Sequence, residues 1–335
     1  MTVDSLRSRI TTDVEAAAEV LRRGGLIGLP TETVYGLGAD ASSSDAVGRI
    51  FAAKGRPAGH PLIVHLASVA QVPAWADLDD ALVDQVAALA EACWPGPLTV
   101  IVPRSHRVAP EAVGGRTTIG LRVPDHPVAL ALLDAFGGGV AAPSANRFGK
   151  VSPTTAAHVL DDLGERVDLV LDGGPTTVGV ESTIVELGPA GPTMLRPGGV
   201  TIDRLSAVLG RRVVDGRGGE SRASGMLASH YAPTATVELL DDVQALAARM
   251  AELVDGDRSQ RVGVVTAGAI PGAALDLGPW WQVLPAEADG FAAELYGAFR
   301  TADAAGVERL LVIPPRSGAL VDAVLDRLAK AAGAG

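Results

Sequence analysis

Two basic residues, Lys54 and Arg56, flank a glycine in the segment Lys54-Gly55-Arg56-Pro57 and could hold a small anion. The chain has 28 Lys and Arg residues, and only three of them are lysines, at positions 54, 150 and 330. A lysine ammonium is a compact charge that meets a phosphate as a point cation, whereas arginine presents a planar fork. The segment therefore predicts contact with a phosphate or another small anion.

The same segment also has a purely structural interpretation. Residues 44–54 are predicted to form a helix that Gly55 and Pro57 end. Cations in the last turn of a helix complement its dipole whatever the protein does. Both interpretations stay open on this segment alone.

Two further segments combine hydroxyl groups with small residues. Pro30–Gly38 is predicted to be a loop after a buried strand, and its glycines would let a ligand approach the backbone. Residues 142–153 supply two serines, an asparagine and two cations, and lead into a helix predicted from Thr154. The N-terminus of that helix favours an anion. Ordinary capped turns have a similar composition, with Ser152 or Thr154 as the cap.

Several other chemistries find no support. Ser144 and Ser182 lack the flanking glycines of a nucleophile elbow, which argues against a serine hydrolase. The chain has no Gly-x-x-x-x-Gly-Lys-Ser/Thr stretch, so it is not a P-loop NTPase. His60 and His65 have no acidic or cysteine neighbour at ligand spacing, which makes a zinc site a weak hypothesis.

Length and charge limit the class of protein. A chain of 335 residues predicts two domains, which we place at residues 1–210 and 236–335 with a Gly-rich linker at 211–235. The net charge of −11 disfavours stable binding to a long nucleic acid and favours a local cationic pocket for a small anion.

The cellular compartment is predicted from what the sequence does not contain. The single cysteine, Cys93, lies in an apolar stretch and is expected to be a buried thiol in a reducing compartment. No stretch has the apolar length of a signal peptide or of a membrane span. A cytoplasmic protein without membrane contact is therefore expected.

Helix and strand patterns alternate along the chain, which predicts an α/β or α+β layer structure. In the first two thirds, helices are expected at 13–24, 44–54, 79–93, 127–136 and 154–164, and strands at 26–29, 62–66, 98–102, 118–123, 139–142, 167–171 and 183–187. In the tail, strands are expected at 236–240, 261–266 and 307–313, and helices at 241–254, 287–305 and from 319. The tail lacks a Gly-rich phosphate fingerprint, so we interpret it as a lid or interaction module.

Five motifs in order resemble the signature of the threonylcarbamoyl-AMP synthases, the YrdC-like family. They are Pro30 to Gly38, Lys54-x-Arg56-Pro57 with Pro61 to His65, Trp94 to Thr99, Ala142 to Asn146, and Glu181 to Val185. The resemblance covers about residues 10–210. Ser224 to Leu227, His230 to Pro233 and the tail resemble the long form of the family.

The resemblance implies a fold and a reaction. The fold would be a twisted mixed sheet around an open, positively lined cavity, followed by a small Rossmann-like three-layer α/β domain. The reaction would join L-threonine, bicarbonate and ATP, with Mg²⁺, into threonylcarbamoyl-AMP and pyrophosphate. The product would pass transiently to a tRNA threonylcarbamoyl transferase complex, with weak or absent binding of tRNA by this chain.

The resemblance also implies residue roles. Lys54 and Arg56 would be catalytic and neutralise phosphate or bicarbonate charge, and both cations are expected to be partly exposed. The ATP site would comprise Arg56, His60, Thr118, Ser144, Asn146, Ser152, Arg196 and Tyr231. The threonine site would comprise Thr33, His65, Arg122, Ala142 and Ser182, with Arg122 on the carboxylate. Some family members have asparagine at the position of His60, so its contact with the nucleotide could be indirect.

Other YrdC-like functions remain as alternatives. An RNA-binding translation or ribosome factor without adenylate synthesis shares the domain, and the acidic charge weighs against it. A hydrogenase-maturation module would need zinc fingers, which a single cysteine excludes. A fold-mate that binds nucleotide without turnover is a third alternative.

Overall fold

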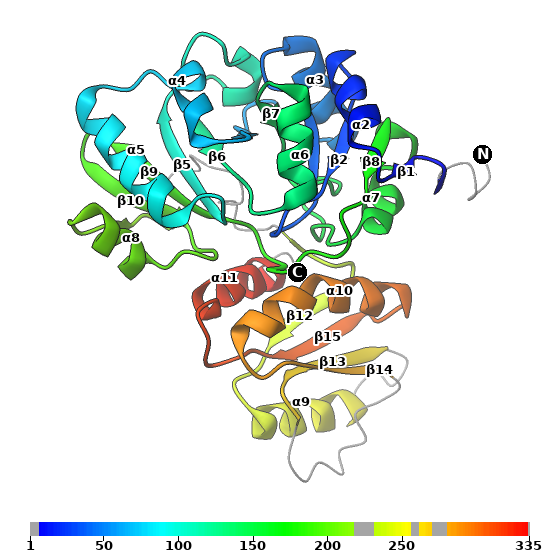
Figure 1. Cartoon of the computed structure of the whole chain (residues 1–335). Helices are drawn as coiled ribbons and strands as arrows, with labels where there is room; N and C mark the ends of the chain where they lie inside the picture. Colours follow the sequence, from blue (N-terminus) through cyan, green and yellow to red (C-terminus); the bar gives the residue numbers. More distant parts are fainter. Residues whose placement is uncertain (1–6, 218–230, 256–260, 270–279, 334–335) are drawn as a thin grey trace. The chain divides into compact units, whose positions relative to one another are not determined.

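The computed structural model describes residues 7–217, 231–255, 261–269 and 280–333. The chain divides into two compact units (Figure 1). The first unit consists of Met1–Phe148, Ser152–Thr177 and Glu181–Met226. The second consists of Leu227–Gly335 together with two short segments from earlier in the chain, Gly149–Val151 and Val178–Val180.

The first unit is built on a mixed sheet of 11 strands in the order β1-β8-β2-β3-β7-β4-β6-β5-β9-β10-β11. Its strands are β1 (Ile10–Thr11), β2 (Ile27–Leu29), β3 (Gly36–Asp40), β4 (Ile63–His65), β5 (Leu98–Pro103), β6 (Thr118–Arg122), β7 (Val140–Ala141), β8 (Leu169–Leu171), β9 (Thr183–Gly188), β10 (Gly191–Arg196) and β11 (Val214–Asp215). Its helices are α2 (Val14–Arg22), α3 (Ser44–Lys54), α4 (Val72–Trp75), α5 (Asp80–Cys93), α6 (Pro127–Phe136), α7 (Ala156–Leu163) and α8 (Ile202–Leu209). The predicted mixed α/β class is confirmed.

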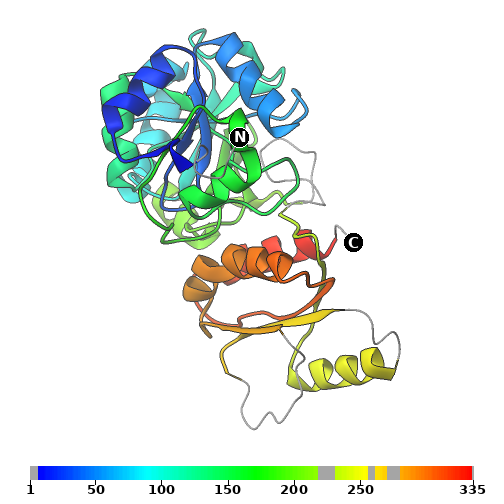
Figure 2. The ribbon, with the colours of Figure 1, turned by 90° about the vertical axis from the view of Figure 1, so that its right-hand side faces the viewer.

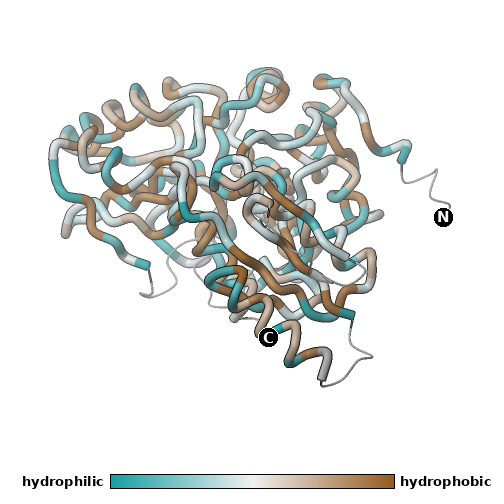
Figure 3. The backbone as a smooth tube through the Cα atoms, turned by 90° about the horizontal axis from the view of Figure 1, so that it is seen from below, coloured by the Kyte–Doolittle hydropathy of each residue, from teal (hydrophilic) through white to brown (hydrophobic). Residues whose placement is uncertain are grey.

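The second unit is a three-layer α/β structure. Its four strands are all parallel in the order β12-β15-β13-β14, with β12 (Thr236–Leu239), β13 (Val262–Ala267), β14 (Trp280–Leu284) and β15 (Arg309–Ile313). Helices α10 (Ala288–Ala304) and α11 (Val321–Ala332) cover one face, and α9 (Val243–Asp255) covers the other (Figure 2). Hydrophobic and hydrophilic stretches alternate along the helices, as expected for elements with one buried side (Figure 3).

Helix ends follow local sequence signals. Ser43 caps α3 through its hydroxyl, and Gly55 ends this helix in a left-handed conformation at φ 66°. Asp13 caps α2 and His126 caps α6. The prediction for α7 was wrong by one residue, because Thr155 caps this helix instead of Ser152 or Thr154. Cys93 is half-buried at the end of α5, so it is less enclosed than expected.

Five strands were not predicted, including β1 and β11, which have two residues each. Residues 36–38, which we expected in a loop, begin β3, because Gly36 to Gly38 pair with β2. Strand β10 pairs antiparallel with β9 through a short turn, and β14 lies at one edge of the second sheet. Strands β3 and β10 contain glycine or proline, which have low strand propensity, so the sequence did not indicate them.

The central strands of the first sheet have two different faces. Val64, Val100, Leu121 and Val185 point into the main hydrophobic core. The residues between them lie on the opposite face because side chains alternate along a strand. There the register places Ile63 and Ile101 opposite Gly120, and His65 opposite Arg122. A small apolar cluster of Ile63, Ile101, Ile184 and Leu195 thus shares this face with polar residues.

Gly198 allows the loop after β10 to approach the start of β9. A Cβ at Gly198 would lie 2.5 Å from the carbonyl carbon of Ser182, and closer still to the amide nitrogen of Thr183. We expect Gly198→Ala to lower the free energy of unfolding by about 1–3 kcal/mol, measured by urea denaturation. The control is Gly48→Ala in α3, where an added Cβ meets nothing within 4 Å. That variant should gain up to about 1 kcal/mol, so equal midpoints for the two would contradict the close approach.

Candidate active site

Arg122, at the end of β6, lies at the centre of the candidate active site. Its side chain is 4% exposed, and each of its nitrogens has one partner. Nε donates to the carbonyl of Gly96 at 3.2 Å, Nη1 donates to the hydroxyl of Thr33 at 2.9 Å, and Nη2 lies 2.7 Å from Oε2 of Glu32. A guanidinium has five N–H groups, so one donor remains on each terminal nitrogen. Two such donors form the fork that binds a carboxylate.

The loop that carries Thr33 is held by its own hydroxyl groups. Thr31 donates through Oγ1 to the carbonyl of Val34 at 2.6 Å, and the same oxygen lies 2.9 Å from Oγ1 of Thr33. The amide of Tyr35 donates to the carbonyl of Pro153 at 2.9 Å. The loop is therefore fixed before any ligand binds, and it presents Thr33 beside Arg122.

Ser182 lies just before β9 and is enclosed by polar partners. Its hydroxyl is 2.8 Å from Oγ1 of Thr99, and Nη2 of Arg196 donates to it at 3.1 Å. Nε of Arg196 also donates to the carbonyl of Ser182 at 2.9 Å. Both residues are buried. The predicted nucleotide residue Arg196 and the predicted threonine residue Ser182 are thus in direct contact.

His65, on β4, is a neutral imidazole beside Arg122. Burial, and then the positive charge of Arg122, lower the pKa of His65 to about 3. Its Nδ1 is buried and has no hydrogen-bond partner within the part of the chain that the structure describes. A neutral imidazole can either donate to a ligand or accept from one, and it adds no charge to the site.

Lys54 organises the loop after β7 from within the protein. Its Nζ donates to the carbonyl of Ser144 at 2.5 Å and to the carbonyl of Asn146, and it lies 3.5 Å from Oδ1 of Asn146. The side chain is 2% exposed, so the expectation that Lys54 is partly exposed was wrong. Burial and the nearby Arg56 lower the pKa of Lys54, while the carbonyl oxygens around it favour the charged ammonium.

The same loop is also joined to the start of β3. The amide of Leu37 donates to the carbonyl of Pro143 at 2.7 Å, and the amide of Ala145 donates to the carbonyl of Tyr35 at 2.8 Å. The amide of Ala142 donates to the carbonyl of Ile63 at 2.9 Å. Residues 142–146 are therefore fixed by Lys54, by the segment 35–37 and by β4.

Arg56 and His60 lie beyond the end of α3. Arg56 is buried, in contrast to the expectation of partial exposure, and its Nη2 donates to the carbonyl of Pro61 at 3.1 Å. His60 is partly exposed and stands edge-on to Phe148, with ring centroids 5.5 Å apart. Burial, Arg56 and Arg116 lower the pKa of His60, so it adds little positive charge near neutral pH.

The remaining predicted residues are placed less centrally. Thr118 begins β6 on the same face as Arg122, and Ser152 donates to Oε1 of Glu181 at 2.6 Å. Tyr231 belongs to the second unit, where its ring stacks 6.1 Å from that of Tyr296. Residues 224–230, including His230, lie outside the described residues. The structure thus brings together three groups: Arg122 with Thr33 and His65, Ser182 with Arg196, and Lys54 with Ser144 and Asn146.

Three functional contacts were missed by sequence reasoning. Glu32, Gly96 and Thr99 each touch Arg122 or Ser182, although none was assigned a role. All three lie inside the quoted motifs. The spacing of a motif does not show which of its residues lie close together in the fold. Only Glu32 gave a signal, because a carboxylate is the expected partner of a buried arginine.

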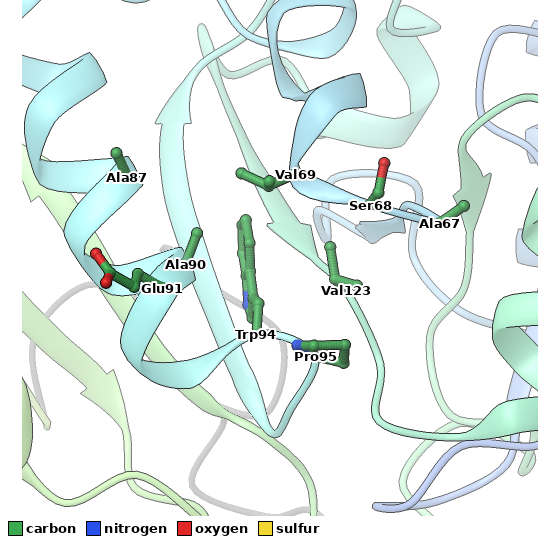
Figure 4. A pocket seen from close by; sticks show the side chains of 9 residues that line it. All are labelled: Ala67, Ser68, Val69, Ala87, Ala90, Glu91, Trp94, Pro95 and Val123. Atoms are coloured by element: carbon green, nitrogen blue, oxygen red, sulfur yellow. The ribbon is translucent and has the colours of Figure 1, made fainter.

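A separate apolar pocket of about 390 Å³ is lined in part by Trp94 and Pro95, which directly precede the Gly96 that contacts Arg122. Figure 4 shows the indole of Trp94 between α5 and Val123, with Val69 and Pro95 at its sides. The indole nitrogen donates to the carbonyl of Leu98 at 2.7 Å, so it is not available to a ligand. This pocket is lined almost entirely by carbon and does not hold the charged groups of the candidate site.

The described ranges show neither a metal-ligand cluster nor a membrane-spanning helix. Across residues 7–217, 231–255, 261–269 and 280–333, no cluster of three His, Cys, Asp or Glu residues could hold a metal ion. Within the same ranges, no helix combines the length and the apolar character needed to cross a membrane.

Comparison with known proteins gives consistent matches along the whole chain. Residues 19–198 match the Sua5/YciO/YrdC family model, described as "Telomere recombination", and residues 200–333 match "Threonylcarbamoyl-AMP synthase, C-terminal domain". Threonylcarbamoyl-AMP synthase of Pyrococcus abyssi is 37% identical over 338 residues, covering 98% of this chain and 97% of the relative. That of Bacillus subtilis is 39% identical, covering 96% and 93%.

A solved structure agrees with these matches. The crystal structure of P. abyssi Sua5 complexed with L-threonine superposes with a TM-score of 0.86 at 37% identity, covering 96% of this chain and 94% of that one. Fold and sequence together define a nucleotidyltransferase of the α/β class. The chain belongs to the threonylcarbamoyl-AMP synthase family, in its long form with both domains.

The contacts of Lys54 predict a mainly structural effect of its removal. In Lys54→Met the carbonyls of Ser144 and Asn146 lose a buried donor, so the free energy of unfolding should fall by about 2–4 kcal/mol in urea denaturation. The control Lys150→Met removes an exposed side chain and should change it by less than about 0.5 kcal/mol. A Lys54→Met protein as stable as the parent would show that this ammonium does not hold the loop.

The neutral His65 predicts a loss of stability in mild acid. Below pH 6.5 the unfolded chain protonates this histidine, whereas the folded protein does not until about pH 3. The unfolded state therefore binds more protons in this window, and stability falls as the pH falls. We expect His65→Asn to remove about 2 kcal/mol of the loss between pH 6.5 and 5, measured by urea denaturation at both values. The exposed His106 supplies the control His106→Asn, and an identical slope for the two variants would refute the effect.

Proposed function

We propose that this chain joins L-threonine, bicarbonate and ATP into threonylcarbamoyl-AMP with release of pyrophosphate. Family membership over both domains supports the reaction, and the P. abyssi relative was solved with L-threonine. The observation that carries the proposal is the buried Arg122, which lies beside Thr33 and His65. This arrangement suits the carboxylate of one small amino acid.

The threonine site is proposed to consist of Thr33, His65, Arg122, Ala142 and Ser182. Arg122 takes the carboxylate as a bidentate pair, and the hydroxyls of Thr33 and Ser182 offer short hydrogen bonds to the remaining polar groups. The neutral His65 adds a further donor or acceptor without repelling the ammonium. Ala142 is buried directly after β7, and its amide donates to the carbonyl of Ile63.

The nucleotide site is proposed to consist of Arg56, His60, Thr118, Ser144, Asn146, Ser152, Arg196 and Tyr231. Arg56 would neutralise phosphate or bicarbonate charge, and Lys54 would act on the same ligands through the loop of Ser144 and Asn146 that it holds. Such a site works by alignment and by charge stabilisation, and it needs no covalent intermediate with the protein.

We propose that Mg²⁺ accompanies ATP. Mg²⁺ is usually bound through substrate phosphates and one or two carboxylates, so we propose that this ion arrives on the triphosphate oxygens. The product is an activated carbamoyl group for tRNA modification, so a tRNA threonylcarbamoyl transferase complex would receive it in a transient contact. The acidic net charge of −11 fits weak or absent binding of tRNA by this chain.

The reaction is tested by pyrophosphate release from ATP by the purified chain. Release should require both threonine and bicarbonate. Arg122→Lys loses the bidentate fork and should raise the KM for threonine by about 10- to 100-fold with a smaller change in the KM for ATP. Arg212→Lys, at an exposed position, is the control and should match the parent. Release that does not depend on threonine would reject the proposed function.

A further inference from the structure

Glu32 is a buried carboxylate that lacks the hydrogen bonds such a group requires. It is 4% exposed, and its one close contact among the described residues is the ion pair of Oε2 with Nη2 of Arg122, at 2.7 Å. In that part of the chain neither Oε1 nor Oε2 accepts a well-directed hydrogen bond. A carboxylate has about four acceptor positions, and buried ones are normally filled. The empty positions point to a donor that comes with a ligand.

The position of Glu32 fixes which donor this is. Arg122 contacts Glu32 through one terminal nitrogen and Thr33 through the other, and each of these nitrogens has a second N–H group that could donate to an incoming carboxylate. In any α-amino acid the nitrogen lies about 2.5 Å from the carboxyl carbon. An amino acid whose carboxylate pairs with Arg122 therefore carries its ammonium within reach of the Glu32 carboxylate.

Charge balance supports the same arrangement. Arg122 and Glu32 form a pair of one buried cation and one buried anion, so a lone anion added to this pair would leave an excess negative charge beside it. A zwitterion adds one charge of each sign. Its carboxylate pairs with Arg122 and its ammonium pairs with Glu32, so every charge in the site has a partner.

Other nearby groups are less suited to this task. His65 is a neutral imidazole beside Arg122, so it brings no negative charge that could pair with an ammonium. Glu181 already accepts a hydrogen bond from Ser152 at 2.6 Å. The negative charge of Glu32 raises the pKa of His126, at the start of α6, but burial has the larger effect and lowers this pKa.

We propose that Glu32 binds the α-ammonium of threonine and removes one proton from it, as the base that prepares the amine for carbamate formation. The ammonium loses one proton to the Glu32 carboxylate, and the free amine attacks the carbon of bicarbonate. A C–N bond forms, one C–O bond breaks, and the oxygen leaves as water with the bicarbonate proton and a second proton from nitrogen. Threonine, bicarbonate and the carboxylate thus give the carbamate, water and a neutral Glu32. The transfer replaces two buried ions by neutral groups, which burial favours.

The inference rests on the proposed function, and its test separates the two. The forward reaction, pyrophosphate release from threonine, bicarbonate and ATP, needs the base. The reverse adenylation step, in which threonylcarbamoyl-AMP and pyrophosphate give ATP and the carbamate, does not. Glu32→Gln keeps the size and polarity of the side chain and removes the base.

We expect Glu32→Gln to lower the forward rate at saturating threonine by about 100-fold or more and to leave the rate of ATP formation from threonylcarbamoyl-AMP and pyrophosphate within about 3-fold of the parent. Glu32→Asp should keep a measurable part of the forward rate because it retains a carboxylate. The exposed Glu165 gives the control Glu165→Gln, which should match the parent in both directions.

The other outcomes decide against the inference. An equal fall in both directions would mean that Glu32 only holds Arg122 in place. An unchanged forward rate would mean that the proton goes elsewhere. A parent protein without activity in either direction would instead reject the proposed function. Thermal unfolding of Glu32→Gln shows whether the variant is folded, and Glu32→Asp tests the role of the carboxylate if it is not.

Discussion

The candidate site depends on one constraint, that a buried guanidinium must have partners for its charge and its donors. Arg122 is 4% exposed, so leaving its charge unpaired would cost several kcal/mol. Its partners come from separate parts of the chain, Gly96 before β5 and Glu32 and Thr33 after β2. Satisfying the arginine therefore brings together the loops from which the rest of the site is built.

Ser144 and Asn146 are likewise held by a buried cation, Lys54. The ammonium of Lys54 has three donors, and backbone carbonyls of Ser144 and Asn146 accept from it. An ammonium used in this way fixes the path of a loop. The compact charge that the sequence suggested for a phosphate thus has an internal partner already, and the buried Arg56 nearby donates to the carbonyl of Pro61. The shared element is β4, which contacts Ala142 at its start and carries His65 beside Arg122 at its end.

Much of the fold could be predicted because local signals agree with it. The apolar spacing in 44–54, the cap at Ser43 and the stop at Gly55 together define α3. Strands β3 and β10 were missed because glycine and proline are frequent in them, and only pairing with a neighbour makes them strands. In the site, residue types were predictable, but burial was not. The sequence shows that Lys54 and Arg56 are cations, whereas their enclosure depends on the packing of distant loops against them. The unassigned Glu32 is the same case, since its partner Arg122 lies 90 positions away in the sequence.

The pairing of Arg122 with Glu32 also bears on selectivity. A simple carboxylic acid could use the same fork of the arginine, but it would bring a second anion beside Glu32 and offer it no donor. Like charges in a low-dielectric site repel strongly, and the buried acceptors of Glu32 would stay empty. An amino acid removes both penalties with one functional group, its ammonium. A site that already contains its own counter-ion can therefore discriminate between an amino acid and its deaminated analogue through the charge pattern alone.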